Sequence, residues 1–150
     1  MAGKNLIVYY SRTGITELLA TALQEKLGCD IDRVQYAERD KVSFAAAGFE
    51  AVRKTTVKIK GDTHDASDYN RIFIISPVWA SSLATPVRSY LAANADKIKS
   101  YALLVTSGGS DVDGAERDAA AAAGKAPDAS QQFLSADIKR GNFDLKSFTE

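Results

Sequence analysis

Short apolar runs alternate with helical patterns along most of the chain, and this alternation restricts the fold more than any other feature. The run Leu6–Tyr10 is continuously apolar, which is typical of a strand buried on both faces. Apolar residues then recur at helical spacing from Ile15 to Leu27, and Gly28 stands where a helix would end. The pattern predicts further strands at Cys29–Val34, Arg71–Ser76, Tyr101–Thr106 and Gln131–Ile138.

Helical patterns separate most of these strands. We predict helices over Ser43–Lys54, from Thr85 to about Ala95, and over Glu116–Ala123. Thr85 is the expected cap of the middle helix, with Pro86 in its first turn. Strand–helix alternation gives right-handed crossovers and therefore a parallel sheet. At 150 residues, the chain is expected to form a single α/β domain spanning 1–150.

The polarity of the predicted strands sets their order in the sheet. Cys29–Val34 carries Asp30, Asp32 and Arg33, which suits an edge strand, whereas strands one, three and four are apolar and belong inside. This favours a five-stranded parallel sheet in the order 2-1-3-4-5. In such sheets a ligand binds outside the carboxyl ends of the strands, where the order reverses between strands one and three.

Three loops leave the sheet at that crevice. The first, Ser11-Arg12-Thr13-Gly14-Ile15-Thr16, places hydroxyls and a glycine at the start of a helix. A helix start attracts phosphate, but the same residues also suit a plain turn with Thr13 as N-cap. Spacing alone leaves both interpretations open. The second loop, Ser76–Leu83, holds the only tryptophan, Trp79, and the third is glycine-rich, Thr106-Ser107-Gly108-Gly109-Ser110-Asp111.

Taken together, the three loops resemble those of the flavodoxins. The matching motifs are Ser11-x-Thr13-Gly14-x-Thr16, Ser76-Pro77-Val78-Trp79 with Thr85-Pro86 further on, and Thr106-Ser107-Gly108-Gly109. Gly48-Phe49-Glu50-Ala51 and Asp68-Tyr69 are similar to segments between strands two and three in one long-linker group of that family. The resemblance covers nearly the whole chain and implies a flavodoxin-like three-layer sandwich.

The resemblance also implies a non-covalent cofactor, FMN. Ser11, Arg12, Thr13, Gly14, Ile15 and Thr16 would hold the phosphate. Trp79 would lie against the isoalloxazine ring, within the contacting segment Pro77, Val78, Trp79 and Ala80. The backbone of Ser107, Gly108, Gly109 and Ser110 would meet the pyrimidine edge. The implied function is electron transfer by one- or two-electron flavin chemistry.

Two departures from the family pattern keep alternatives open. Lysine plus arginine equals the acidic residues at 19 each, whereas many electron-shuttling flavodoxins are strongly acidic. The alternative is an FMN-dependent NAD(P)H:quinone-type reductase of small acceptors, and a third is an association module that has lost FMN. Family members usually end in a full amphipathic helix, but Asn142–Glu150 fits only about two turns at ~1.5 Å per residue. We expect a short or incomplete C-terminal helix. Two explanations are open: another subunit of a homo-oligomer covers part of that sheet face, or the chain was shortened.

Composition and missing motifs exclude several other classes. The zero net charge and the absence of a basic stripe argue against nucleic-acid binding, and no run approaches the ~20 apolar residues of a membrane span. A lone Cys29 and the expected lack of a signal peptide favour the cytoplasm. The chain lacks the motifs of four other classes: the paired acids of a receiver domain, the G-x-G-x-x-G of a dinucleotide-binding domain, the phosphate loop of nucleotide hydrolases and the G-x-S-x-G of serine hydrolases.

One cysteine and one histidine make a metal site improbable, and His64 is predicted to be a surface residue. The expected partner is a redox protein or a small acceptor such as a quinone.

Overall fold

The computed structural model describes residues 4–37, 56–79, 81–109 and 113–149. Five parallel strands form its main sheet, in the order β2-β1-β5-β7-β8. Their bounds are β1 Asn5–Tyr9, β2 Asp30–Arg33, β5 Arg71–Trp79, β7 Tyr101–Ser107 and β8 Ala129–Leu134. The predicted order 2-1-3-4-5 is confirmed, with the polar strand at one edge.

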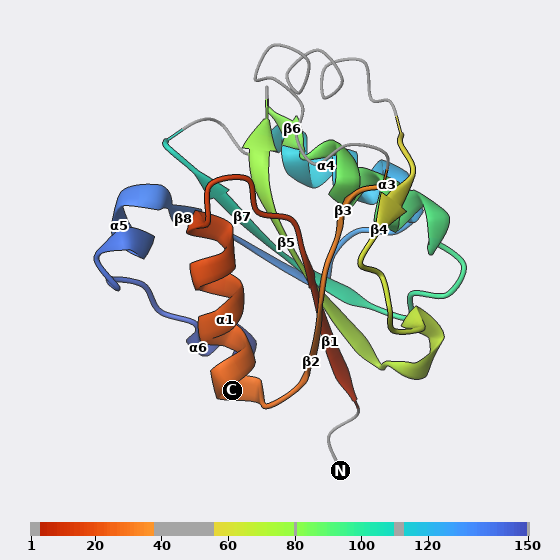
Figure 1. Cartoon of the computed structure of the whole chain (residues 1–150), viewed down its shortest axis with the longest axis horizontal. Coiled ribbons are helices and arrows are strands. Elements are labelled where there is room, and N and C mark those ends of the chain that lie inside the picture. The colour runs from red at the N-terminus through yellow and green to blue at the C-terminus, as the bar shows by residue number, and fades with distance from the viewer. Residues whose placement is uncertain (1–3, 38–55, 80, 110–112, 150) are drawn as a thin grey trace.

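Helices cover both faces of this sheet (Figure 1). One face carries α1 (Ile15–Leu27) with two short helices, α5 (Ser135–Lys139) and α6 (Lys146–Thr149). The other carries α3 (Thr85–Ala93) and α4 (Asp113–Ala123). The fold is therefore the expected three-layer sandwich.

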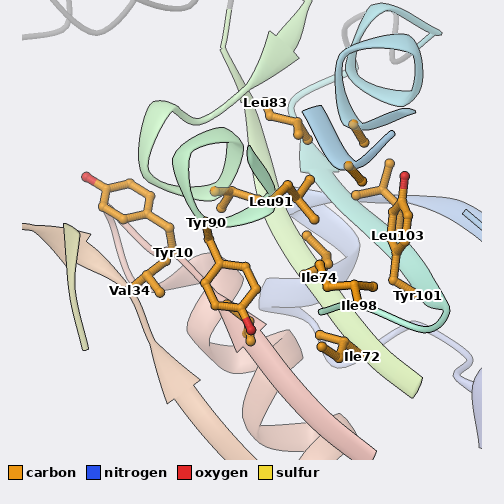
Figure 2. Packing of buried hydrophobic residues seen from close by; sticks show 14 of the residues in the cluster. Tyr10, Val34, Ile72, Ile74, Leu83, Tyr90, Leu91, Ile98, Tyr101 and Leu103 are labelled. Carbon is orange, nitrogen blue, oxygen red and sulfur yellow. The ribbon is translucent and has the colours of Figure 1, made fainter. Parts of the chain in front are cut away.

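Each face of the sheet has its own apolar core, because alternate residues of a strand point to opposite sides. On the α3 and α4 side, Ile72, Ile74 and Leu103 pack against Tyr90 and Leu91 (Figure 2). The α1 side buries a second set, which includes Ile7, Leu19, Phe73, Leu104 and Phe148. Burial of one such side chain contributes roughly 1.5–3 kcal/mol, so the two cores hold the sheet edge rigid for the loops that follow it.

The C-terminal segment packs on the α1 face as a short helix, as predicted. Leu145 and Phe148 are only 2% and 3% exposed. The Phe148 ring lies 6.3 Å from that of Phe73 and 6.4 Å from that of Phe133. The end of the chain itself thus covers part of this face, while homo-oligomer formation stays a prediction.

Two strands have boundaries that differ from those predicted by more than one residue. The third strand was expected to stop at Pro77, but β5 continues to Trp79 because Val78 and Trp79 pair antiparallel with β6 (Ser82–Leu83). The last strand ends at Leu134, where pairing with Ser107 ends, and residues expected to continue it form α5. Pro77 has no amide hydrogen to donate and was therefore expected to end the third strand. The antiparallel pairing of β5 with β6 beyond Pro77 keeps the chain extended to Trp79.

The polar stretch before Asn70 contains structure that hydropathy did not reveal. β3 (Gln35–Tyr36) and β4 (Ile59–Lys60) pair antiparallel, and a short 3₁₀ helix, η1, spans Ala66–Asp68. His64, predicted to be a surface residue, is partly exposed, and its Nδ1 lies 2.6 Å from Oδ1 of the buried Asp32. A buried carboxylate requires partners, and the partly exposed imidazole is one of them. The predicted helix Ser43–Lys54, with the motif Gly48-Phe49-Glu50-Ala51, lies outside the described residues.

Candidate functional site: three loops at the carboxyl edge of the sheet

The first loop is organised by Ser11 rather than by Thr13. The amides of Gly14 and Glu17 donate to Ser11 Oγ at 3.0 and 3.3 Å. Gly14 is the N-cap residue of α1 by backbone position, in a left-handed conformation with φ 93°. The prediction that Thr13 caps the helix is therefore wrong, because the left-handed Gly14 separates Thr13 from the first turn.

This arrangement leaves a polar surface facing solvent at the start of α1. Thr13 is exposed, Arg12, Gly14 and Ile15 are half-buried, and Thr16 is buried. A Cβ placed on Gly14 would meet no heavy atom within 4 Å, so there is open space above the loop. First-turn amides of a helix have no intrahelical acceptor, and they attract anions. The geometry suits a phosphate group.

A buried hydrogen bond joins this helix start to the strand before the third loop. Thr16 Oγ1 lies 2.9 Å from Thr106 Oγ1, and both residues are 3% exposed. The two residues are 90 positions apart in the chain. The first and third loops therefore lie against each other, as expected from the strand order.

The second loop brings the only tryptophan to the same edge. Trp79 is half-buried, and its ring meets that of Tyr10 edge to face, with centroids 5.4 Å apart and an interplanar angle of 87°. Pro77 and Val78 are also half-buried, while Ala80 lies outside the described residues. Because Tyr10 comes directly after β1, Trp79 stands beside the first loop.

The third loop combines a fixed base with an open tip. Ser107 is buried, and its Oγ accepts hydrogen bonds from Gln132 Nε2 at 2.7 Å and from Gly109 N at 3.3 Å. Ser135 Oγ donates to the Ser107 carbonyl oxygen. Gly108 and Gly109 are exposed, and a Cβ on either would meet nothing within 4 Å. Ser110 lies outside the described residues.

Charged and phenolic side chains flank the first loop. Arg33 Nη2 donates to the Ser11 carbonyl oxygen at 3.3 Å, and its Nη1 lies 3.5 Å from Glu17 Oε2. Burial raises the pKa of Tyr9, and the carboxylate of Glu17, to which its hydroxyl donates, raises it further. Burial also raises the pKa of Tyr10, although the positive charges of Arg12 and Arg33 oppose that effect. Both phenols are neutral at physiological pH.

Sequence reasoning missed four residues that support the loops. They are Tyr10 beside Trp79, Arg33 on the Ser11 carbonyl, and Gln132 and Ser135 on Ser107. The position of Tyr10 at the end of strand one was a usable signal for a residue at the site. The other three act from strands or helices remote in sequence, and no local motif marks them.

The three loops together suit a phosphorylated planar ligand better than a metal ion. Open backbone and hydroxyl groups, a helix start and a half-buried aromatic ring lie along one edge of the sheet. In the part of the chain that the structure describes, no three His, Cys, Asp or Glu side chains are grouped to hold a metal. The same residues contain no helix long and apolar enough to cross a membrane.

Comparison with known families agrees with this geometry. The family model described as Flavodoxin matches residues 4–144. The chain belongs to the flavodoxin family. A search of curated proteins found no match for this flavodoxin.

Several solved structures share the fold. A flavoprotein from Lactobacillus acidophilus NCFM, solved in complex with FMN, is 22% identical with a TM-score of 0.78, covering 93% of this chain and 98% of its own. A protein from Bacteroides eggerthii DSM 20697 is 19% identical with a TM-score of 0.72, covering 93% of this chain and 95% of its own. An NADH:FMN oxidoreductase (EMOB) in apo form is 13% identical with a TM-score of 0.52, covering 94% of this chain and 81% of its own.

Proposed function

We propose that this flavodoxin binds FMN non-covalently and acts in electron transfer. The observation that carries the proposal is the joint placement of the α1 start, Trp79 and the open Gly108-Gly109 tip at one sheet edge. Each feature matches one part of FMN: the phosphate, the ring face and the polar ring edge. The FMN complex of the Lactobacillus flavoprotein, which shares the fold, is consistent with this assignment.

The residues present fit the cofactor at its phosphate. The amides at the start of α1 would donate to the phosphate oxygens, assisted by the hydroxyl of the exposed Thr13 and the positive end of the helix. Arg33 adds positive charge beside the loop and donates to the Ser11 carbonyl oxygen. Ser11 keeps the loop in shape through its bonds to Gly14 and Glu17.

The ring side of the site is apolar and preformed. Trp79 offers a flat surface that Tyr10 holds edge-on, and Gly108 and Gly109 allow close approach of the backbone to a ring edge. FMN, when bound, accepts one or two electrons, and the protein sets its orientation and electrostatic surroundings.

A second candidate function is reduction of small acceptors such as quinones with NAD(P)H. The supporting observation is the zero net charge, which gives little electrostatic steering towards a charged protein partner. The NADH:FMN oxidoreductase with the same fold is compatible with this activity. A redox protein remains the proposed partner for the main function. A cytoplasmic location, consistent with the lone Cys29, belongs to the same proposal.

Flavin absorption tests the proposal directly. The purified protein, reconstituted with FMN and freed of excess, should show flavin absorption and should quench the fluorescence of added FMN. A colourless protein that leaves FMN fluorescence unchanged would contradict it. If the protein then oxidises NAD(P)H with a quinone and without a partner protein, the result favours the reductase function. If it does not, the result favours an electron carrier.

A further inference from the structure

The strands that present Trp79 are held by a buried ion pair from two helices. We call the antiparallel pair Val78–Trp79 and Ser82–Leu83 the tryptophan hairpin. Arg88 of α3 and Asp118 of α4 are 3% and 6% exposed, and Arg88 Nη2 lies 2.7 Å from Asp118 Oδ2. Arg88 Nε lies 3.0 Å from both carboxylate oxygens. The geometry is that of a strong, two-point interaction.

This ion pair takes both backbone hydrogen-bonding groups of Leu83. The Leu83 amide donates to Asp118 Oδ2 at 3.1 Å, and Arg88 Nη2 donates to the Leu83 carbonyl oxygen at 3.3 Å. Leu83 itself inserts its side chain into the core beside α3 (Figure 2). The last residue of the hairpin is therefore fixed in position and in orientation.

A second contact restricts the hairpin near its turn. Ser81 has φ 61°, the left-handed conformation that side chains other than glycine rarely adopt. A Cβ on Gly114 of α4 would lie 2.0 Å from the Ser81 carbonyl oxygen, so only glycine permits this close approach. Ser76 completes the arrangement, because its Oγ accepts from Ala84 N at 3.1 Å and donates to the Pro77 carbonyl oxygen at 2.8 Å.

Space borders the hairpin on the helix side. Arg88, Asp118, Gly114 and Ser82 contribute to the wall of a cavity of about 660 Å³ between α3 and α4. On this side the ion pair restrains the hairpin through its polar contacts with Leu83.

We propose that Arg88 and Asp118 are positioning residues for the flavin ring: by clamping Leu83 they hold Trp79 in its ring-binding orientation before the cofactor binds. The effect on flavin binding rests on the proposed function. The orientation of Trp79 does not, because it is a property of the protein without cofactor. Preorganisation of this kind raises affinity by reducing what must be ordered on binding.

The test uses paired apolar substitutions, because removal of one partner would leave a buried charge. In Arg88→Met/Asp118→Leu, the only tryptophan should become more mobile without any flavin present. Time-resolved anisotropy and acrylamide quenching of its fluorescence measure this. FMN and riboflavin should both bind about three- to tenfold more weakly, the range expected for ordering one side chain on binding. Equal losses place the effect at the ring rather than at the phosphate.

A matched control is available at the other end of the sheet. Arg71 and Asp128 form a two-point pair, at 3.0 and 2.7 Å, beside the start of β5. Arg71→Met/Asp128→Leu should change neither Trp79 anisotropy nor flavin affinity. Arg88→Lys keeps the charge but loses the two-point geometry, and it replaces the double variant if that protein does not fold. It should show the same increase in the mobility of Trp79.

The outcomes separate the two proposals. A wild-type protein that binds no flavin refutes the proposed function, while the anisotropy measurement still tests the clamp. If Trp79 is as mobile in a folded Arg88→Met/Asp118→Leu protein, or in Arg88→Lys, as it is in the wild type, the proposal that Arg88 and Asp118 hold Trp79 is refuted. A loss of FMN affinity much larger than that of riboflavin affinity would also overturn it.

Discussion

The hydrogen bond between Thr16 and Thr106 gives the sharpest test of how the loops are held together. Its two hydroxyl oxygens are 2.9 Å apart, and both residues are 3% exposed, so water does not replace a lost partner easily. Thr16→Val removes one hydroxyl with little change of shape. We expect it to lower the free energy of unfolding by about 1–3 kcal/mol, the cost of a buried polar group left unsatisfied. Thr106→Val should cost a similar amount.

The double variant distinguishes this bond from two independent packing effects. When apolar groups of the same shape replace both partners, the change is often close to neutral. The double variant Thr16→Val/Thr106→Val should therefore lose clearly less free energy of unfolding than the two single variants lose together. The difference, which is the coupling energy of the two hydroxyls, should be about 0.5–3 kcal/mol. Thr106→Ser keeps the hydroxyl and should lose less stability than Thr106→Val.

Urea unfolding followed by far-UV circular dichroism measures these differences. With a slope of about 1–3 kcal/mol per molar urea, a loss of about 2 kcal/mol moves the midpoint by roughly 1 M. Slopes must agree among variants, so that midpoints report stability rather than changed compactness. If the single losses add within about 0.5 kcal/mol, the two hydroxyls are not coupled and the contact between the loops has been misassigned.

Three further predictions concern the first loop and Tyr101 at the start of β7. Thr13→Ala should weaken FMN binding far more than riboflavin binding, as measured by fluorescence titration; equal losses would show that Thr13 does not contact the phosphate. Ser11→Ala should lower the free energy of unfolding by about 1 kcal/mol in urea titrations, because Ser11 Oγ accepts from the Gly14 and Glu17 amides; Ser11→Asp should keep an acceptor for these amides but repel the phosphate, and a Ser11→Ala protein of wild-type stability would contradict this role of Ser11. Burial, together with the negative charge of Glu116, raises the pKa of Tyr101 from an ordinary value of 10 to about 12. The fold favours the neutral phenol, so stability is full below pH 10 and falls between pH 10 and about 12. Tyr101→Phe should reduce that fall in alkaline urea titrations, and an unchanged pH profile would refute the assignment.

The sheet and the placement of the loops could be predicted because each depends on local pattern and on chain topology. Leu6–Tyr10 is apolar throughout because β1 is buried on both faces, and the charges of Asp30 and Arg33 placed β2 at an edge. Parallel strands joined by right-handed crossovers then bring their carboxyl ends to one side. That is why Thr16 and Thr106 meet across 90 positions of sequence, although no motif names them as a pair.

The detailed supports of the site could not be predicted, for a different physical reason. Thr13 and Ser11 are both residue types that accept from the amides of a helix start, and the local sequence does not show that Gly14 takes the N-cap position while Ser11 accepts from the Gly14 and Glu17 amides. The extension of β5 past Pro77 to Trp79 depends on its pairing with β6, and the Leu83 amide of β6 donates to Asp118 of a remote helix.

Asp118 shows how such a support stays invisible in the sequence. Within the alanine-rich helix α4 it reads as a solvent-facing charge, and so does Arg88 in α3. Each is a buried charge that needs an opposite charge beside it, and the pair forms only when both helices lie on the same sheet face. Their joint orientation towards Leu83 gives a buried charge pair a positional role at the edge where Trp79 stands. A charged residue whose place in one helix suggests exposure to solvent can therefore act on the geometry of a binding loop in another element.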